Sequence, residues 1–355
     1  MSGEWTFEPD LSRAATPPAG WYLDPERLAA ERRRVFARTW QPVGSAAAAR
    51  EPGSFFTAEV AGEPLVVARD AGGALRALSN VCRHRAGPVA RGSGSAKALR
   101  CGYHGWTYGL DGSLLATPEW DGVRDFDPAA HRLPEFRAEA WGPFLFVNLD
   151  PDAAPLSGFL GSIADETRAL GLERLRPFRR VDYEVACNWK VYVDNYLEGY
   201  HIPIVHPELF RLLDYRAYRI ETSRLHSKQH APIRGAAGGG EALYYWLFPN
   251  VMVNVYPDNL QTNVVLPLSA GRTLTRFEWF VRDPDRPGAA EEFDRAFELS
   301  DRIQREDMEI CEAVQRGLSS ATYVSGRYSV LRENGVHHFH GLLARYLASG
   351  AAAAV

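Results

Sequence analysis

Two short segments of the chain each pair one cysteine with one histidine. Cys82 and His84 are separated by one residue, and Cys101 and His104 by two. Two thiolates and two imidazoles are the ligands of a [2Fe–2S] cluster in which cysteines hold one iron and histidines hold the other. Neutral imidazoles raise the reduction potential of such a cluster above that of a four-cysteine cluster. The spacing therefore predicts a relay for single electrons.

A structural zinc site is the alternative for the same four residues, because it uses the same ligand types. Zinc fingers, however, usually place two cysteines together and two histidines together, with wider spacing than is found here. Glycine and proline flank both segments, at Gly87-Pro88 and at Gly105. Such residues allow tight turns whose backbone N–H groups can approach the cluster sulfurs. The pattern favours the iron–sulfur cluster.

A second group of possible metal ligands follows Cys187, on residues 188–200 that are predicted to be helical and just beyond them. His201 and His206 are five residues apart, so they would not share a face of a straight helix. Pro203 is expected to break the helix and to turn His206 back towards His201. Two histidines and one carboxylate form the facial triad of non-haem Fe(II) oxygenases, which leaves positions open for O2 and substrate. The residue pattern alone leaves the carboxylate open among Glu306, Asp307 and Glu309.

The elements around these residues are a mixture of strands and helices. Asp24-Pro25 marks the start of an amino-terminal helix over 24–37. A long helix is predicted over 287–317 because its apolar residues recur at mostly helical spacings. The predicted strands cover residues 64–68, 142–148, 178–187 and 242–280, the last broken at Pro249, Pro257 and Gly271. A small antiparallel β domain followed by an α+β domain with room for a substrate is therefore expected.

Composition narrows the class of protein. The chain has 355 residues, 46% of them hydrophobic, which is enough for more than one domain. Its net charge of −4 gives no reason to expect nucleic-acid binding. No run of about 18 apolar residues and no cleavable leader is found, so a soluble cytoplasmic protein without membrane contact is expected. Cys187 and Cys311 are predicted to be reduced thiols in the core.

These motifs together resemble those of the Rieske non-haem iron oxygenases, the family of aromatic-ring-hydroxylating oxygenase alpha subunits. Residues 40–150 are similar to the Rieske domain of that family. Within the family the choline monooxygenase branch is the most similar in segments 248–254, 262–267, 312–318, 326–328 and 337–340. The resemblance implies an amino-terminal arm over 1–38, a Rieske domain over 39–150 and a helix-grip catalytic domain over 151–355.

The resemblance also implies a role for each candidate site residue. Its [2Fe–2S] ligands are Cys82, His84, Cys101 and His104, and its Fe(II) ligands are His201, His206 and Asp307. Glu198 corresponds to an acidic residue that carries electrons between a cluster histidine of one subunit and an iron histidine of its neighbour. Most relatives that resemble the aromatic-ring dioxygenases have Asp there, so the side chain of this chain is one methylene longer. Asp194 and Asn195 are expected to orient ligands, and His337–His340 to pack and form hydrogen bonds.

The function implied is an oxygenase component, a mono- or dioxygenase that hydroxylates or demethylates a small organic substrate. No dinucleotide-binding motif is present, so a ferredoxin or a flavin reductase, or both, must supply the electrons. A head-to-tail homotrimer would let each cluster serve the iron of the next subunit. Aromatic or natural-product hydroxylation, and an electron carrier fused to a ligand-binding domain, are the alternatives.

The substrate is less well determined by the sequence than the chemistry. Aromatic faces can cage a quaternary ammonium such as choline or a betaine. The candidates for such a cage are Tyr244, Tyr245, Trp246, Phe248, Trp279 and Phe280. Aromatic residues in strands are also ordinary core residues, so each of these side chains could serve packing instead.

Overall fold

A computed structural model describes residues 5–234, 240–256 and 259–348 of the chain, and the chain divides into two compact units. One unit is Phe36–Phe159, and the other combines Met1–Val35 with Leu160–Val355. The amino-terminal arm thus groups with the carboxy-terminal part of the chain. Pro257, where a strand break was predicted, lies outside the described residues. None of the described helices is both long and apolar enough to cross a membrane.

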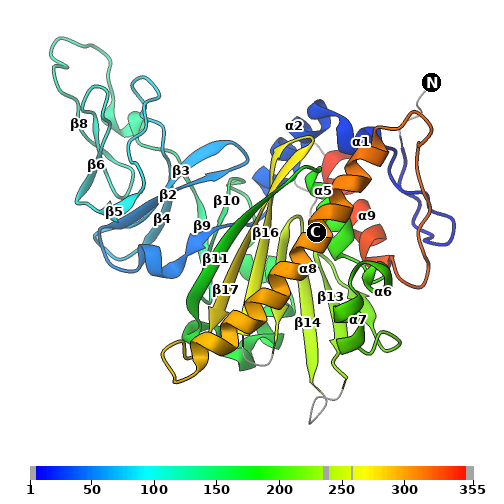
Figure 1. Cartoon of the computed structure of the whole chain (residues 1–355). Coiled ribbons are helices and arrows are strands. Elements are labelled where there is room, and N and C mark those ends of the chain that lie inside the picture. The colour runs from blue at the N-terminus through cyan, green and yellow to red at the C-terminus, as the bar shows by residue number, and fades with distance from the viewer. Residues whose placement is uncertain (1–4, 235–239, 257–258, 349–355) are drawn as a thin grey trace. The chain divides into compact units, whose positions relative to one another are not determined.

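The unit Phe36–Phe159 is built from antiparallel strands, as predicted. Its larger sheet has the order β1-β10-β9-β4-β3-β2-β5, and its smaller sheet has the order β6-β7-β8. Figure 1 labels all of these strands except β1 and β7. The larger sheet consists of β1 Gln41–Ser45, β2 Ser54–Val60, β3 Glu63–Arg69, β4 Leu75–Ser79, β5 Ser93–Ser95, β9 Glu135–Trp141 and β10 Phe144–Asn148. The smaller sheet consists of β6 Ala98–Arg100, β7 Thr107–Gly109 and β8 Leu114–Ala116. Both cysteine–histidine segments therefore lie on loops, which the sheets hold in place.

The other unit is an antiparallel sheet crossed by a long helix, which confirms the α+β helix-grip fold. The strand order is β11-β17-β16-β15-β14-β13-β12. The strands are β11 Arg176–Val185, β12 Arg219–Thr222, β13 His226–Pro232, β14 Glu241–Leu247, β15 Val251–Val255, β16 Asn259–Ser269 and β17 Arg272–Val281. The helices are α1 Gly20–Leu23, α2 Pro25–Arg34, α4 Ile163–Glu166, α5 Trp189–Tyr196, α6 Ile202–Val205, α7 Pro207–Leu212, α8 Ala289–Leu318 and α9 Asn334–Ala348. The short helix α3, Leu156–Leu160, spans the boundary between the units.

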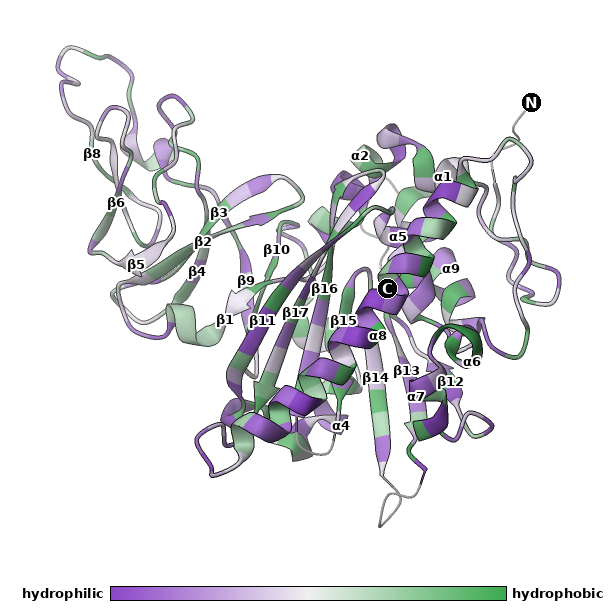
Figure 2. Cartoon of the chain, viewed as in Figure 1, coloured by the Kyte–Doolittle hydropathy of each residue, from purple (hydrophilic) through white to green (hydrophobic). Residues whose placement is uncertain are grey.

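Helix α8 crosses one face of this sheet and alternates between polar and apolar stripes (Figures 1 and 2). Its buried residues, among them Phe293, Gln304 and Cys311, recur at helical spacings and face inward. Glu291 and Glu292 occupy its first turn, where the positive end of the helix dipole stabilises acidic side chains. The prediction of a long helix here is confirmed. Asp307 lies on this helix.

The predicted helix over 188–200 is wrong beyond residue 196. Asn188 caps α5 by accepting a hydrogen bond from the backbone N–H of Lys190, and the helix ends at Tyr196. The chain then turns and re-enters a helix at Ile202, with Pro203 in the first turn of α6. Proline is tolerated there because the first N–H groups of a helix have no intrahelical partner. The break thus precedes His201 instead of following it.

The arm helix α2 begins as predicted, because Asp24 caps it by accepting a hydrogen bond from the N–H of Glu26 at 2.9 Å. Farther along this helix, Glu31 is completely buried against α5. Its carboxylate accepts from Trp189 Nε1 and forms an ion pair with Lys190 Nζ, both at 2.7 Å. Burial lowers the pKa of Lys190, while the neighbouring Glu31 acts in the opposite direction. The pair holds the arm on the helix that leads into the second candidate site.

Replacing Glu31 with glutamine should lower the free energy of unfolding by about 3–5 kcal/mol, because it leaves the buried Lys190 ammonium without a counter-ion. Urea unfolding followed by tryptophan fluorescence measures the change. Glu26→Gln is the matched control on the exposed side of the same helix and should change stability by less than about 0.5 kcal/mol. Equal stabilities of the two variants would contradict a structural role for the pair.

Candidate active site

The four residues of the first candidate site come together within the unit Phe36–Phe159. The thiols of Cys82 and Cys101 are buried, and the rings of His84 and His104 lie 4.6 Å apart between centroids. A cavity is bordered by three of the four, His84, Cys101 and His104. A Cβ at Gly87 would lie 3.0 Å from Cys101 Sγ, so only glycine fits at this position without a shift. The loops thus crowd around one small space.

The donor atoms in this space fit an iron–sulfur cluster. His84 Nδ1 is buried and has no hydrogen-bond partner among the described residues. Burial, together with the neighbouring His104, lowers the pKa of His84 and favours the neutral imidazole. The hydroxyl of Tyr108 lies 3.4 Å from Cys82 Sγ and accepts a hydrogen bond from the N–H of Arg83. Two buried thiols and an unpartnered imidazole nitrogen are what a [2Fe–2S] ligand set requires.

His84→Cys should yield some protein that retains a cluster with a lower reduction potential, by roughly 100 mV or more, because a thiolate adds negative charge. A redox titration followed by visible absorption measures this potential. His131→Cys, a histidine of the same unit outside the two segments, is the control and should leave the potential near that of the unchanged protein. An unchanged midpoint in a cluster-containing His84→Cys protein would remove His84 from the ligand set.

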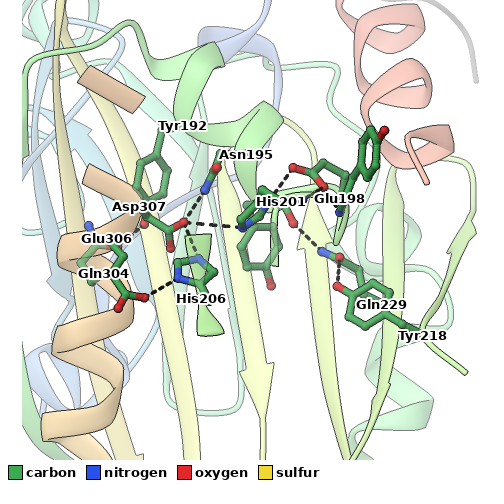
Figure 3. A network of polar contacts seen from close by, with 12 residues as sticks. Tyr192, Asn195, Glu198, His201, His206, Tyr218, Gln229, Gln304, Glu306 and Asp307 are labelled. Atoms are coloured by element: carbon green, nitrogen blue, oxygen red, sulfur yellow. Dashed lines mark hydrogen bonds and ion pairs between the residues drawn. The ribbon is translucent and has the colours of Figure 1, made fainter. Parts of the chain in front are cut away.

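The second candidate site joins the ends of α6 to the middle of α8 (Figure 3). One ligand atom each from His201, His206 and Asp307 lie within 4.8 Å of one another. Asp307 Oδ1 is 3.0 Å from His206 Nε2 and 3.7 Å from His201 Nε2. His201 precedes α6 and His206 ends it, so this single turn brings both rings to the same carboxylate. The three donors fit a facial triad, with two imidazoles and one carboxylate.

Each imidazole is oriented by a second carboxylate on its other nitrogen. Glu198 Oε1 lies 2.5 Å from His201 Nδ1, and Glu306 Oε2 lies 2.6 Å from His206 Nδ1. Since a proton on Nδ1 leaves the Nε2 lone pair free, both rings are set to present Nε2 towards Asp307. Glu306 therefore contacts His206 Nδ1, whereas Asp307 faces His206 Nε2. The third candidate carboxylate, Glu309, is exposed.

Helix α5 contributes to this arrangement through Asn195, which donates to Asp307 Oδ1 at 2.6 Å (Figure 3). Its neighbour Asp194 faces another way and contacts the hydroxyl of Tyr22 at 2.8 Å and His340 Nε2 at 3.0 Å. Tyr328 completes this group with a 2.7 Å contact to His340 Nδ1. The His337–His340 segment therefore packs and forms hydrogen bonds, as predicted, and Asp194 does not touch the triad.

A cavity of about 340 Å³ opens beside the triad, between α8 and the sheet. Of the aromatic residues predicted as a cage, only Tyr244 and Trp279 line it. Tyr245 and Phe280 are the next residues on the same strands, so their side chains point to the opposite face of the sheet. The lining aromatic residues that sequence reasoning missed are Tyr192, Tyr196, Tyr218, Tyr256 and Phe277. Strand alternation from Trp279 could have found Phe277.

Comparison with known families finds two matches in this chain. Residues 39–127 match the Rieske [2Fe-2S] domain, and residues 172–349 match the ring hydroxylating alpha subunit (catalytic domain). The first match holds both cysteine–histidine segments. The second holds Glu198 and all three residues of the triad.

Three relatives are similar along most of this chain. Choline monooxygenase of Arabidopsis thaliana is 37% identical, over 95% of this chain and 84% of the relative. The carnitine monooxygenase oxygenase subunit of Escherichia coli is 30% identical, over 94% of each. The crystal structure of the quaternary ammonium Rieske monooxygenase CntA with L-carnitine aligns with a TM-score of 0.83 and 29% identity, over 94% of this chain and 96% of CntA. The chain therefore belongs to the family of Rieske ring-hydroxylating oxygenase alpha subunits and is an O2-dependent oxidoreductase with a [2Fe–2S] cluster and a mononuclear iron.

Proposed function

We propose that this chain is a monooxygenase that oxidises a small quaternary ammonium compound. The observation that carries the proposal is the lining of the cavity beside the triad. Aromatic faces such as Tyr196, Tyr244 and Trp279 surround it, and the carboxylate of Glu198 also borders it. A quaternary cation is attracted by aromatic faces and by negative charge, and it needs no hydrogen-bond acceptor. Burial raises the pKa of Tyr196 and Tyr244, so both rings stay neutral.

The relatives support the same substrate class. Choline monooxygenase and carnitine monooxygenase are named for quaternary ammonium compounds, and one solved structure of CntA contains gamma-butyrobetaine. Naphthalene 1,2-dioxygenase has the same fold but is only 20% identical to this chain. Hydroxylation of an aromatic or natural-product substrate is the alternative that the sequence leaves open.

In this proposal the residues of the two candidate sites hold the metals. Cys82, His84, Cys101 and His104 hold the cluster, and His201, His206 and Asp307 hold the mononuclear iron. The iron bound there supplies the chemistry of O2 reduction. Glu306, Glu198 and Asn195 fix the orientation of the triad through the contacts described above. The cavity lies beside the triad, so a substrate bound in it would be next to the iron.

The proposal includes partners that supply electrons. A ferredoxin or a flavin reductase, or both, would reduce the protein one electron at a time. A homotrimer in which the cluster of one subunit serves the iron of the next would give Glu198 its role as a bridge between the subunits. One solved structure of CntA is described as revealing inter-subunit electron transfer, which supports this assembly.

Metal analysis and a substrate screen test the function. An oxygenase should contain about three irons and two acid-labile sulfides per chain, whereas a fused electron carrier should contain two irons. The screen follows product formation coupled to O2 uptake with choline and with naphthalene, using a surrogate reductase. Product from choline alone is the expected result. Product from naphthalene alone would replace this function with aromatic-ring hydroxylation.

A further inference from the structure

The floor of the cavity is a row of five side chains that crosses five neighbouring strands. Consecutive members of the row are paired residues on β13, β14, β15, β16 and β17. The row consists of Gln229, Tyr244, Asn254, Gln261 and Trp279, and every member lines the cavity. Paired residues of an antiparallel sheet share a face, so the whole row points towards α8. Asn263, two residues beyond Gln261, lies on the same face and also lines the cavity.

Two amides on this floor have their oxygens occupied. Asn254 Oδ1 accepts a hydrogen bond from the hydroxyl of Tyr196 at 2.6 Å. Asn263 Oδ1 accepts from Gln261 Nε2 at 3.0 Å. Neither amide nitrogen, Asn254 Nδ2 or Asn263 Nδ2, has a hydrogen-bond partner within the described part of the chain. An amide nitrogen can only donate, so the floor offers donors to an oxygen inside the cavity.

The charges around the cavity decide which kind of oxygen fits. Among the described residues that line it, none is lysine or arginine. Asp307 also lines the cavity but belongs to the triad, where iron would offset its charge, so Glu198 is the acidic residue of the lining that would repel an anion. A carboxylate taken into this cavity would lose its hydration and find no lysine or arginine to pair with in the described lining, which is costly. A hydroxyl or another uncharged oxygen loses far less hydration, and two N–H donors can replace its water.

We propose that the substrate joins its quaternary ammonium to an uncharged oxygen group instead of a carboxylate, and that Asn254 and Asn263 donate to that oxygen. This inference rests on the proposed function and assigns two residues that determine specificity. With these two donors and no lysine or arginine among its described lining residues, the cavity should accept hydroxyl compounds such as choline and reject zwitterions such as the betaines and carnitine.

Competition between matched substrates tests the proposal. Equimolar pairs drawn from choline, glycine betaine and ethyltrimethylammonium are given to the iron-loaded protein with a surrogate reductase and O2. The ratio of products in each pair gives the ratio of the two kcat/KM values. Choline should be preferred to glycine betaine by at least roughly 100-fold, since a buried carboxylate would be unpaired. Ethyltrimethylammonium, which lacks the oxygen, should fall below choline by roughly 10-fold.

A variant of one donor tests the assignment of the residues. Asn263→Leu has a similar volume but no N–H, so the choline to ethyltrimethylammonium ratio should fall about 10-fold. Thr262→Val alters the next residue, which does not line the cavity, and should leave that ratio unchanged. Glycine betaine consumed as fast as choline would overturn the proposal, and so would an unchanged ratio in Asn263→Leu. Turnover of none of the three compounds would overturn the proposed function itself.

Discussion

Asp307→Ala should lose about one of three irons per chain and all detectable product formation, while the visible spectrum of the cluster persists. The carboxylate of Asp307 is the point on which both imidazoles converge, at 3.0 Å from His206 Nε2 and 3.7 Å from His201 Nε2. Without it, two neutral imidazoles offer no negative charge and too few ligands for Fe(II). Iron and sulfide assays on protein purified without oxygen measure the first effect, and product yield measures the second.

Two neighbours of Asp307 on α8 serve as controls. Glu309→Ala alters an exposed carboxylate and should retain all the iron and normal turnover. Glu306→Gln keeps a group that can accept a hydrogen bond from His206 but removes the charge, so it should retain iron with an affinity lowered by about 10- to 100-fold. Full iron content and normal turnover in Asp307→Ala would show that another carboxylate is the third ligand.

The sequence restricts the candidate ligands strongly, because few kinds of site use this combination of residue types. The two cysteine–histidine segments contain Cys82, His84, Cys101 and His104. Few sites other than an iron–sulfur cluster or a zinc site use such a set of ligands. The long helix and the strands β3, β10, β11 and β14–β17 were also predictable, since their side-chain patterns are typical of these elements.

The features that the sequence missed depend on the tertiary fold. Continuation of α5 to Tyr200 was expected from local pattern, but the chain leaves the helix after Tyr196 and carries the Glu198 carboxylate to His201. Which of the three acids on α8 faces the Nε2 atoms of both histidines depends on the rotation of that helix against α6, and spacing within the helix does not reveal it. The row of five side chains across the sheet is set by the register of five strands. β16 and β15 had to be paired before Asn254 and Gln261 could be recognised as neighbours.

Glu198→Gln should lower steady-state turnover by at least roughly 100-fold while both metal sites still load. The carboxylate of Glu198 accepts hydrogen bonds from the backbone N–H groups of Tyr200 and His201 through Oε2, and contacts His201 Nδ1 through Oε1. A glutamine can keep its oxygen on the backbone, but its NH2 then faces the protonated Nδ1, and two donors cannot share a hydrogen bond. The imidazole loses its anionic partner, and a histidine of a neighbouring subunit would lose the same partner.

A single-turnover experiment separates this relay from a merely structural effect. Chemically reduced Glu198→Gln protein is mixed with substrate and O2, and its visible absorption and product yield are followed together. If Glu198 connects the two metal sites, absorption should remain that of the reduced protein and product should not form, although the protein accepts electrons normally. The ion pair of Lys190 and Glu31 holds α5, the helix that precedes Glu198, and does not touch His201. Glu31→Gln is therefore the control for loosening of α5 and should reoxidise at the normal rate. Rapid reoxidation with normal product yield in Glu198→Gln would show that Glu198 only orients His201 and does not connect the two metal sites.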